Sequence, residues 1–349
     1  MADSFRVALS GDFKKADGSP TYPDFDVGPL RAAAGVETAF IDPLNPIESR
    51  QLEDFDALIL LAHRFAPGSV PKSGRLGVIA RFGVGYDTVD VDACTKAGIA
   101  VVITPDGVRR PVAVSIITLM LALTGKLMVK DALTREGPPG FARRGDYMGL
   151  GLVGRVLGSV GIGNIGAELF RLAKPFDMRF IAHDPYADAK VATELGVELV
   201  SLEDIFRQAD IVNVNCPLTP QTRGLVNAER LALMKPTSYL INTARGPIVD
   251  QKALTATLKA RRIAGAGLDV LEHEPSDLDD PILTLHNVIL GRTHCAGPIS
   301  ASAATVPRTS RRCWTSSTDA RRISWSTAPC SSRSAGAAAW PIFGRFGSK

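Results

Sequence analysis

The sequence lacks the features that mark membrane, secreted and metal-binding proteins. Its 349 residues include five cysteines, which show neither metal-ligand spacing nor an even set for disulfide pairing. The longest apolar run, residues 112–124, is too short to cross a membrane, and the first residues contain no signal-peptide hydrophobic core. These absences predict a reduced, cytoplasmic protein with no membrane partner and no bound metal.

A strong charge of one sign is also missing from most of the chain. The formal net charge is +4, but residues 292–349 alone hold nine Lys and Arg residues against one acidic residue. The remaining residues therefore carry a net charge of −4, which argues against a nucleic-acid partner. With 45% hydrophobic and 22% charged residues, the chain has the composition and length of a soluble protein with two domains.

What the sequence does contain is a glycine-rich turn between an expected strand, residues 156–160, and an expected helix. Gly161, Gly163 and Gly166 follow the pattern GxGxxG. Gly161 permits a tight turn, Gly163 lets a phosphate approach the backbone, and Gly166 lets the helix pack closely on the strand. The free N–H groups of the helix would face a pyrophosphate, although a plain turn has the same local pattern.

An acidic residue at the right distance favours the dinucleotide interpretation. Asp184 ends the next expected strand, 18 residues after Gly166, where a carboxylate reaches the ribose hydroxyls of a bound dinucleotide. The same carboxylate would repel a 2′-phosphate, and the residues that follow are Pro185 and Tyr186 instead of arginine. We therefore expect NAD as the cofactor in preference to NADP.

Short apolar runs alternate with helical patterns on both sides of this turn, which predicts two doubly wound α/β domains. In the first hundred residues the expected strands are 5–9, 37–41, 57–61, 76–80 and 99–103, and the expected helices are 27–34, 46–55 and 91–97. A polar connection at 105–110 and an apolar helix at 112–129 follow. The later strands are 156–160, 180–182, 197–200, 211–215, 239–242 and 265–270, with a further strand at 287–290 and helices at 188–195, 202–208, 228–234 and 251–260. We expect the second unit to be a six-stranded nucleotide-binding domain.

Three charged residues near strand ends are candidates for chemistry on a 2-oxo acid. Arg245 follows the strand 239–242, and its planar guanidinium could hold a carboxylate and a ketone oxygen, unless it is a surface arginine in a turn. Asp269 and Glu274 follow the next strand, where acids are as often solvated as functional. His294 is the one histidine beyond the strand 287–290 and is the candidate acid/base. These groups suggest hydride transfer between a nicotinamide and a hydroxyl-bearing carbon.

The first domain offers one further candidate site. The stretch RFGVGYD places Gly83 and Gly85 in a turn at a strand end, where successive backbone N–H groups could cup a carboxylate. A plain turn is a nearly equally good interpretation of these residues alone.

Four stretches together resemble the D-isomer-specific 2-hydroxyacid dehydrogenases. They are ARFGVGYDTVDVDACTKAGIAVVITP, VGIGNIG with HDP, ADIVNVNCPLTPQTRGLVNAERLALMKPTSYLINTARGPIVDQKAL, and AGAGLDVLEHEP, which cover residues 76–290 in order. The resemblance implies a flavodoxin-like substrate domain at residues 1–105, which a C-terminal segment normally completes. It also implies an inserted Rossmann NAD-binding domain at 106–298, followed here by an atypical Ser/Arg-rich tail at 299–349.

The resemblance also implies roles for individual residues. Arg245 matches the catalytic arginine, Glu274 matches the acid that pairs with the catalytic histidine, and Asp269 matches the aspartate near the nicotinamide. Val84 and Gly85 match the loop that binds the substrate carboxylate. Further NAD contacts are implied at Asn164, Ile165, Cys216, Pro217 and Thr243.

The resemblance further implies a small 2-oxo or 2-hydroxy acid substrate and a homodimer joined through the NAD domains and the helix at 112–129. The alternative function is an NAD-binding family member that is catalytically impaired, or one that acts as a corepressor-like interaction protein.

The sequence departs from the family pattern after Leu290. The family has two residues between NVIL and its catalytic histidine, whereas this chain has three before His294. From Gly291 onward the chain also holds all three tryptophans and eleven serines. We therefore hypothesise a shifted reading frame. If one lost base is restored after Leu290, the permitted codons include AHALCWTDQ, so that a histidine follows NVIL after two residues.

Sequencing the coding DNA over codons 288–296 tests this hypothesis. We expect one base to be missing after codon 290, with the restored frame encoding the histidine at the family spacing. An uninterrupted frame that encodes GRTHCAG, together with the same tail in close relatives, would refute it.

Overall fold

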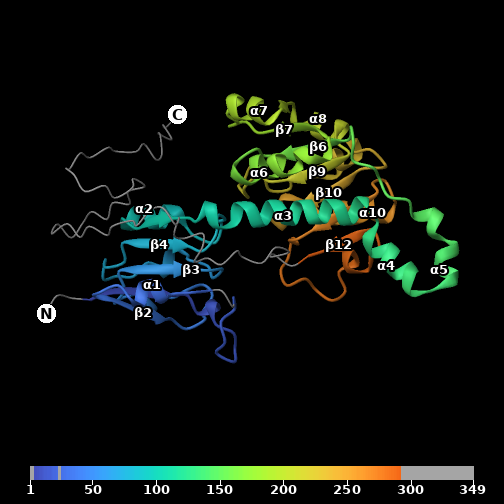
Figure 1. Cartoon of the computed structure of the whole chain (residues 1–349). Coiled ribbons are helices and arrows are strands. Elements are labelled where there is room, and N and C mark those ends of the chain that lie inside the picture. Colours follow the sequence, from blue (N-terminus) through green and yellow to red (C-terminus); the bar gives the residue numbers. More distant parts are fainter. Residues whose placement is uncertain (1–3, 23–24, 292–349) are drawn as a thin grey trace.

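The computed structural model describes residues 4–22 and 25–291, which form two separate parallel β-sheets (Figure 1). The first sheet has the strand order β2-β1-β3-β4-β5. Its strands are β1 (Phe5–Leu9), β2 (Val36–Phe40), β3 (Ala57–Leu60), β4 (Val78–Arg81) and β5 (Ala100–Val102). This is the doubly wound order of the flavodoxin-like fold, so the predicted fold of the first domain is confirmed.

The second sheet has the strand order β12-β11-β10-β9-β6-β7-β8, which contains the Rossmann order. Its strands are β6 (Val156–Val160), β7 (Arg179–His183), β8 (Val197–Leu199), β9 (Ile211–Val214), β10 (Tyr239–Asn242), β11 (Gly265–Leu268) and β12 (Val288–Leu290). The expectation of six strands was wrong, because Val288–Leu290 pairs in parallel with β11 and adds a seventh.

Most of the expected helices are present with small changes of boundary. They are α1 (Gly28–Arg31), α2 (Val91–Ala97), α6 (Asn164–Ala173), α7 (Ala189–Leu195), α8 (Leu202–Gln208), α9 (Ala228–Leu233) and α10 (Gln251–Lys259). The helix expected at 46–55 is only a 3₁₀ turn at Ser49–Gln51. The backbone N–H of Ile47 instead donates to the carbonyl of Arg64, 2.9 Å away, so this segment pairs with a neighbouring loop.

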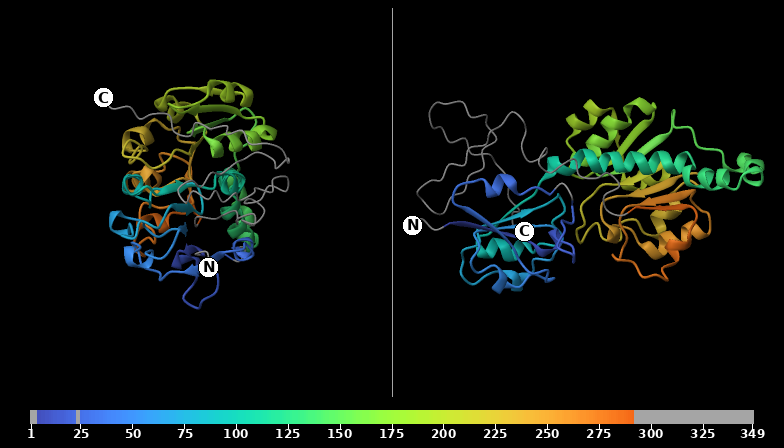
Figure 2. Two further views of the ribbon diagram at one scale, coloured as in Figure 1. Left: turned by 90° about the vertical axis from the view of Figure 1, so that its left-hand side faces the viewer. Right: turned by 60° about the horizontal axis from the view of Figure 1, so that its bottom comes forward.

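The expectations for residues 105–129 also need correction. Helix α3 (Pro105–Thr124) begins where a polar connection was expected, because Pro105 occupies the first helical turn and Pro111 lies in the interior. The helix then ends early, since Lys126 adopts φ 55°, and α4 (Leu127–Arg135) and α5 (Pro138–Ala142) follow as separate helices. Figures 1 and 2 show α4 and α5 at the end of the molecule farthest from the first sheet.

Helix α3 is long and apolar enough, by length and composition, to cross a membrane, and no other helix among residues 4–22 and 25–291 is. In this fold it packs against α6, β10 and β11, and 44% of its apolar window is buried. Figures 1 and 2 show α3 running from the side of the first sheet along the second sheet. Its buried apolar residues, which include Ile116, Leu119 and Met120, are part of the protein core.

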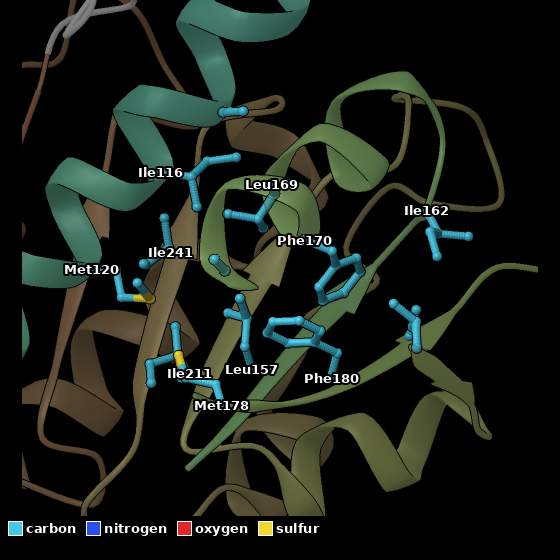
Figure 3. Packing of buried hydrophobic residues seen from close by; sticks show 14 of the residues in the cluster. Ile116, Met120, Leu157, Ile162, Leu169, Phe170, Met178, Phe180, Ile211 and Ile241 are labelled. Atoms are coloured by element: carbon cyan, nitrogen blue, oxygen red, sulfur yellow. The ribbon is translucent and has the colours of Figure 1, made fainter. Parts of the chain in front are cut away.

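A large apolar cluster lies between α3, α6 and one face of the second sheet (Figure 3). Ile116 and Met120 of α3 meet Phe170 of α6 and Leu157 of β6, and all four side chains are fully buried. Each such side chain contributes about 1.5–3 kcal/mol to folding. The opposite face of the sheet is covered by α8, α9 and α10, which bury a second cluster of similar extent. Both faces of the sheet are thus covered, as parallel sheets require.

One buried carboxylate ties α3 to α6. Glu168 of α6 is 6% exposed and accepts a hydrogen bond from Nη1 of Arg110 at 2.7 Å. Arg171 lies 3.4 Å and Arg109 4.0 Å from the same carboxylate. The hydrogen bond from Arg110 and the nearby positive charges hold the pKa of Glu168 below its usual range. The carboxylate is therefore ionised at neutral pH and fixes α3 beside the helix that follows the glycine turn.

Candidate active site

The glycine turn has a geometry that side chains larger than hydrogen would disturb. Gly161 adopts φ +102°, and a Cβ there would lie 3.0 Å from the carbonyl carbon of Asn215. A Cβ on Gly166 would lie 2.5 Å from the carbonyl oxygen of Gly161. By contrast, a Cβ on Gly163 would meet nothing within 4 Å. Two of the glycines are therefore needed for close packing, and the third leaves open space in front of the turn.

Helix α6 begins directly after this open space. Gly163 is its N-cap residue, no side chain caps the helix, and Asn164 and Ile165 form its first turn. Helix N-termini present free N–H groups and a partial positive charge, which suit a phosphate. The donor set at this turn therefore fits the pyrophosphate of a dinucleotide.

Asp184 is held against the turn by two backbone groups. It follows β7 directly, and its Oδ2 accepts a hydrogen bond from the N–H of Ile162 at 3.0 Å. Its Oδ1 accepts from the N–H of Tyr186 at 2.9 Å. These bonds fix the carboxylate at the edge of the turn, where the sequence predicted a ribose contact.

A cavity of about 330 Å³ opens beside the glycine turn and Asp184. This volume is within the range of small-molecule sites. Gly163, Asn164 and Asp184 line it, together with Arg109 of α3 and Arg171 of α6. Sequence reasoning did not single out Arg109, because nothing local to it indicates that α3 passes the nucleotide turn.

Other predicted cofactor residues lie at the carboxyl ends of neighbouring strands. Cys216 and Pro217 follow β9, Thr243 follows β10, and Asp269 follows β11. Because these strands are parallel, the residues share one edge of the sheet, which is the edge where open α/β sheets bind ligands. The hydroxyl of Thr243 is buried and has no hydrogen-bond partner in the part of the chain that the structure describes, so it is available to a bound group.

Arg245 joins the two sheets at this edge. Its Nε donates to Oδ1 of Asp87 at 2.9 Å, and its Nη1 donates to the carbonyl of Ala244 at 2.8 Å. A Cβ on Gly85 would lie 1.4 Å from Nη2 of Arg245, so the guanidinium lies directly on the backbone of Gly85. Two predicted substrate residues, Arg245 and Gly85, are thus in contact although they come from different sheets. Val84 is the neighbouring residue in the same loop.

Glu274 lies in an exposed loop after β11. Its Oε1 accepts a hydrogen bond from the backbone N–H of Leu271 at 2.8 Å. His294, its predicted partner, lies outside the described residues. Within the described part of the chain, no group of three or more His, Cys, Asp or Glu side chains is arranged to hold a metal ion.

Asp87 contacts the candidate site residue Arg245 but was not singled out from the sequence. Its partner Arg245 is 158 residues away along the chain. In the sequence, Asp87 is marked only by its position two residues after Gly85. That position does not show which cation the carboxylate contacts. The contact follows only from how the two sheets are placed.

Comparisons with known proteins agree with this arrangement. Residues 117–296 match the family model described as D-isomer specific 2-hydroxyacid dehydrogenase, NAD binding domain. The chain is 39% identical over 264 residues to a glyoxylate reductase of Korarchaeum cryptofilum, covering 75% of this chain and 78% of the relative. It is also 39% identical over 241 residues to a D-3-phosphoglycerate dehydrogenase of Methanocaldococcus jannaschii, covering 68% of this chain and 45% of the relative.

Solved structures show the same fold. A glyoxylate reductase from Paecilomyes thermophila superimposes with a TM-score of 0.71 at 27% identity, covering 86% of this chain and 91% of the other. The apo form of a Rhodotorula graminis D-mandelate dehydrogenase gives 0.72 at 28% identity with the same coverage. An acyclic imino acid reductase in complex with NADPH and D-Arg gives 0.73 at 25% identity, covering 86% and 93%.

Cys216 is a predicted cofactor residue, and the reactivity of its thiol can test that prediction. Burial raises the pKa of its thiol to about 11. The reactive thiolate is therefore scarce at pH 7.5, and its fraction increases as the pH approaches the pKa. We expect iodoacetamide to modify Cys216 in the folded protein at least about tenfold more slowly than in the urea-unfolded chain, because the lower thiolate fraction outweighs the higher nucleophilicity. Peptide mass spectrometry measures both rates.

Cys94 provides the internal control, since burial also raises its pKa to about 11 and it lies in the first domain. Saturating NAD should slow modification of Cys216 further and leave Cys94 unchanged. Equal rates for Cys216 in the folded and unfolded protein, or no effect of NAD on Cys216, would contradict the expectation.

Proposed function

Because the chain belongs to the D-isomer specific 2-hydroxyacid dehydrogenase family, we propose that it interconverts a small D-2-hydroxy acid and its 2-oxo acid by hydride transfer with NAD. The observation that carries this proposal is the placement of Arg245 on the backbone of Gly85. It brings a cation for a carboxylate to the sheet edge that also carries the predicted cofactor residues.

The cofactor would be held by the glycine turn, with Asp184 on the adenosine ribose. Gly161, Gly163, Asn164, Ile165 and Gly166 form the phosphate-binding turn. Cys216, Pro217, Thr243 and Asp269 lie along the sheet edge toward Arg245 and would line the rest of the dinucleotide. The bound nicotinamide supplies or accepts the hydride; the side chains of this chain bind, orient and move protons.

Arg245 would bind the substrate and polarise its carbonyl. Asp87 holds Nε of the guanidinium at 2.9 Å, which leaves Nη2 directed at Gly85. A substrate carboxylate placed against Val84 and Gly85 would therefore contact Arg245. The 2-oxo oxygen of the substrate could accept a hydrogen bond from the same guanidinium. A positive charge at that oxygen stabilises the charge that develops as the hydride is transferred.

A histidine paired with Glu274 would supply or remove the hydroxyl proton. A carboxylate partner orients an imidazole and raises its basicity, which suits an acid/base that works near neutral pH. His294, or the histidine that the restored reading frame places after Leu290, is the candidate. An active protein needs one of these side chains in the cleft.

The role of Arg245 can be tested with Arg245→Met. We expect NADH consumption with glyoxylate, hydroxypyruvate or pyruvate to lose about 100-fold or more in kcat/KM, because a charged donor at the reacting oxygen is removed. The kcat/KM of Arg245→Lys should lie between those of the wild type and Arg245→Met, since lysine keeps the charge but lacks the planar fork. Arg207→Met is the control, because Arg207 lies exposed on α8 and forms an ion pair with Asp204 at 3.6 Å.

The same assay decides between the enzyme and its alternative. A wild-type protein that binds NADH but reduces none of the three acids would contradict the enzymatic proposal. That result would favour the NAD-binding interaction protein.

The proposed preference for NAD depends on Asp184 and is tested with Asp184→Asn. Loss of the carboxylate removes the repulsion of a 2′-phosphate, so the ratio of kcat/KM for NADH to that for NADPH should fall at least about tenfold. Asp188→Asn is the matched control: Asp188 lines the same cavity and caps α7, where asparagine serves equally well. If both variants changed the ratio equally, Asp184 would not be the selective residue.

A further inference from the structure

A second guanidinium lies against the loop that faces Arg245. Arg81 is the last residue of β4, and its side chain folds over the loop, so that Nη1 lies 3.1 Å from where a Cβ on Gly83 would be. The same Nη1 donates to the carbonyl of Phe82. Arg245 covers Gly85 from the other sheet. The short loop from Gly83 to Gly85 therefore has a cation at each end.

This loop is firmly placed. Gly83 adopts φ +136°, which side chains other than hydrogen rarely allow, and its N–H donates to Oγ1 of Thr104 at 2.9 Å. The N–H of Thr104 donates in turn to the carbonyl of Gly83 at 2.9 Å. The loop that both guanidinium groups contact is thus held in one backbone conformation.

Arg81 has no carboxylate at contact distance among the residues that the structure describes. Within residues 4–22 and 25–291, it forms no ion pair of 4.0 Å or less, and its Nε is buried without a hydrogen-bond partner. Asp87 is bonded to Arg245, and Asp12 accepts hydrogen bonds from the hydroxyl of Ser10 at 2.6 Å and from two backbone N–H groups. Asp87 and Asp12 attract Arg81 only from a longer distance.

The electrostatic surroundings also disfavour the charged form of Arg81. Burial, followed by repulsion from Arg245, lowers the pKa of its guanidinium, although an arginine remains charged at neutral pH. Two like charges held near one loop, one of them short of acceptors, are relieved by an anion placed between them. The anion that reaches this loop in the proposed function is the substrate carboxylate.

We propose that Arg81 is a second substrate-binding residue, which together with Arg245 clamps the carboxylate of the 2-oxo acid over the loop from Gly83 to Gly85. This inference rests on the proposed function of Arg245 and extends it to a residue of the first domain. It predicts a strict requirement for a carboxylate in the substrate, because a neutral ligand leaves both guanidinium groups without an anion.

The test is equilibrium binding of D-lactate and neutral D-lactamide to the NADH complex, measured by calorimetry; neither ligand can react with NADH. We expect Arg81→Met to weaken D-lactate binding at least about tenfold, as for a lost charged hydrogen bond, and to reduce the preference for D-lactate over D-lactamide by a similar factor. Arg81→Lys should retain part of the D-lactate affinity and part of the preference for D-lactate over D-lactamide. If the role of Arg81 were purely structural, Arg81→Met would weaken the binding of D-lactate and of D-lactamide by the same factor.

Two controls separate the outcomes. Arg31→Met makes the same charge change at an exposed position on α1 and should alter neither affinity. Arg245→Met tests the proposed function: if that variant keeps its D-lactate affinity, the proposed function fails, whereas the role of Arg81 is decided by the Arg81 variants themselves.

The inference is overturned if Arg81→Met binds D-lactate within about twofold of wild type. It is also overturned if the ratio of the two affinities does not change. Should Arg81→Met fail to bind NADH, Arg81→Lys and Arg81→Gln are judged by the same criterion. Loss of NADH binding in all three variants would assign Arg81 a structural role only.

Discussion

The contact of Arg245 with Asp87 and Gly85 is the interaction on which the proposed chemistry depends. Arg245 comes from the end of β10 and Asp87 from the loop after β4, so one guanidinium spans the two sheets. Glycine at position 85 is required, because any Cβ there would overlap the guanidinium. The amide of Asn242 donates to the carbonyl of Arg245 at 3.0 Å and fixes the backbone from which the side chain extends. This contact brings the loop after β4 against the carboxyl-terminal edge of the second sheet.

The nucleotide turn is fixed by the same kind of constraint, a close approach that only glycine allows. Gly166 lies on the carbonyl of Gly161, and Asp184 accepts the N–H of Ile162, so that turn, helix and acid form one unit. The buried Glu168 then connects α6 to α3 through Arg110. Because α3 also packs on β10 and β11, the glycine turn and the strand that carries Arg245 share one support.

Local patterns predicted the strands well, because strands of a parallel sheet that are buried on both faces appear as continuous apolar runs. They failed where a segment's partner lies elsewhere in the chain. Residues 46–55 have a helical pattern, but Ile47 hydrogen-bonds to the loop at Arg64. Residues 105–110 look polar, yet they form the first turns of α3, where Arg110 meets Glu168. The extra strand at the edge of the second sheet is defined by its pairing with β11.

The sequence by itself determined the glycine turn, the acid that follows β7 and the order of α/β units, because these are set by neighbours within about 30 residues of one another. It also marked Arg245 and the Gly83–Gly85 loop as separate candidates. Only the tertiary structure decided that they meet, that Asp87 orients the arginine, and that Arg81 stands at the other end of the loop. The reason is physical: a salt bridge between residues 158 positions apart depends on how two sheets are placed against each other, and no local propensity encodes that placement.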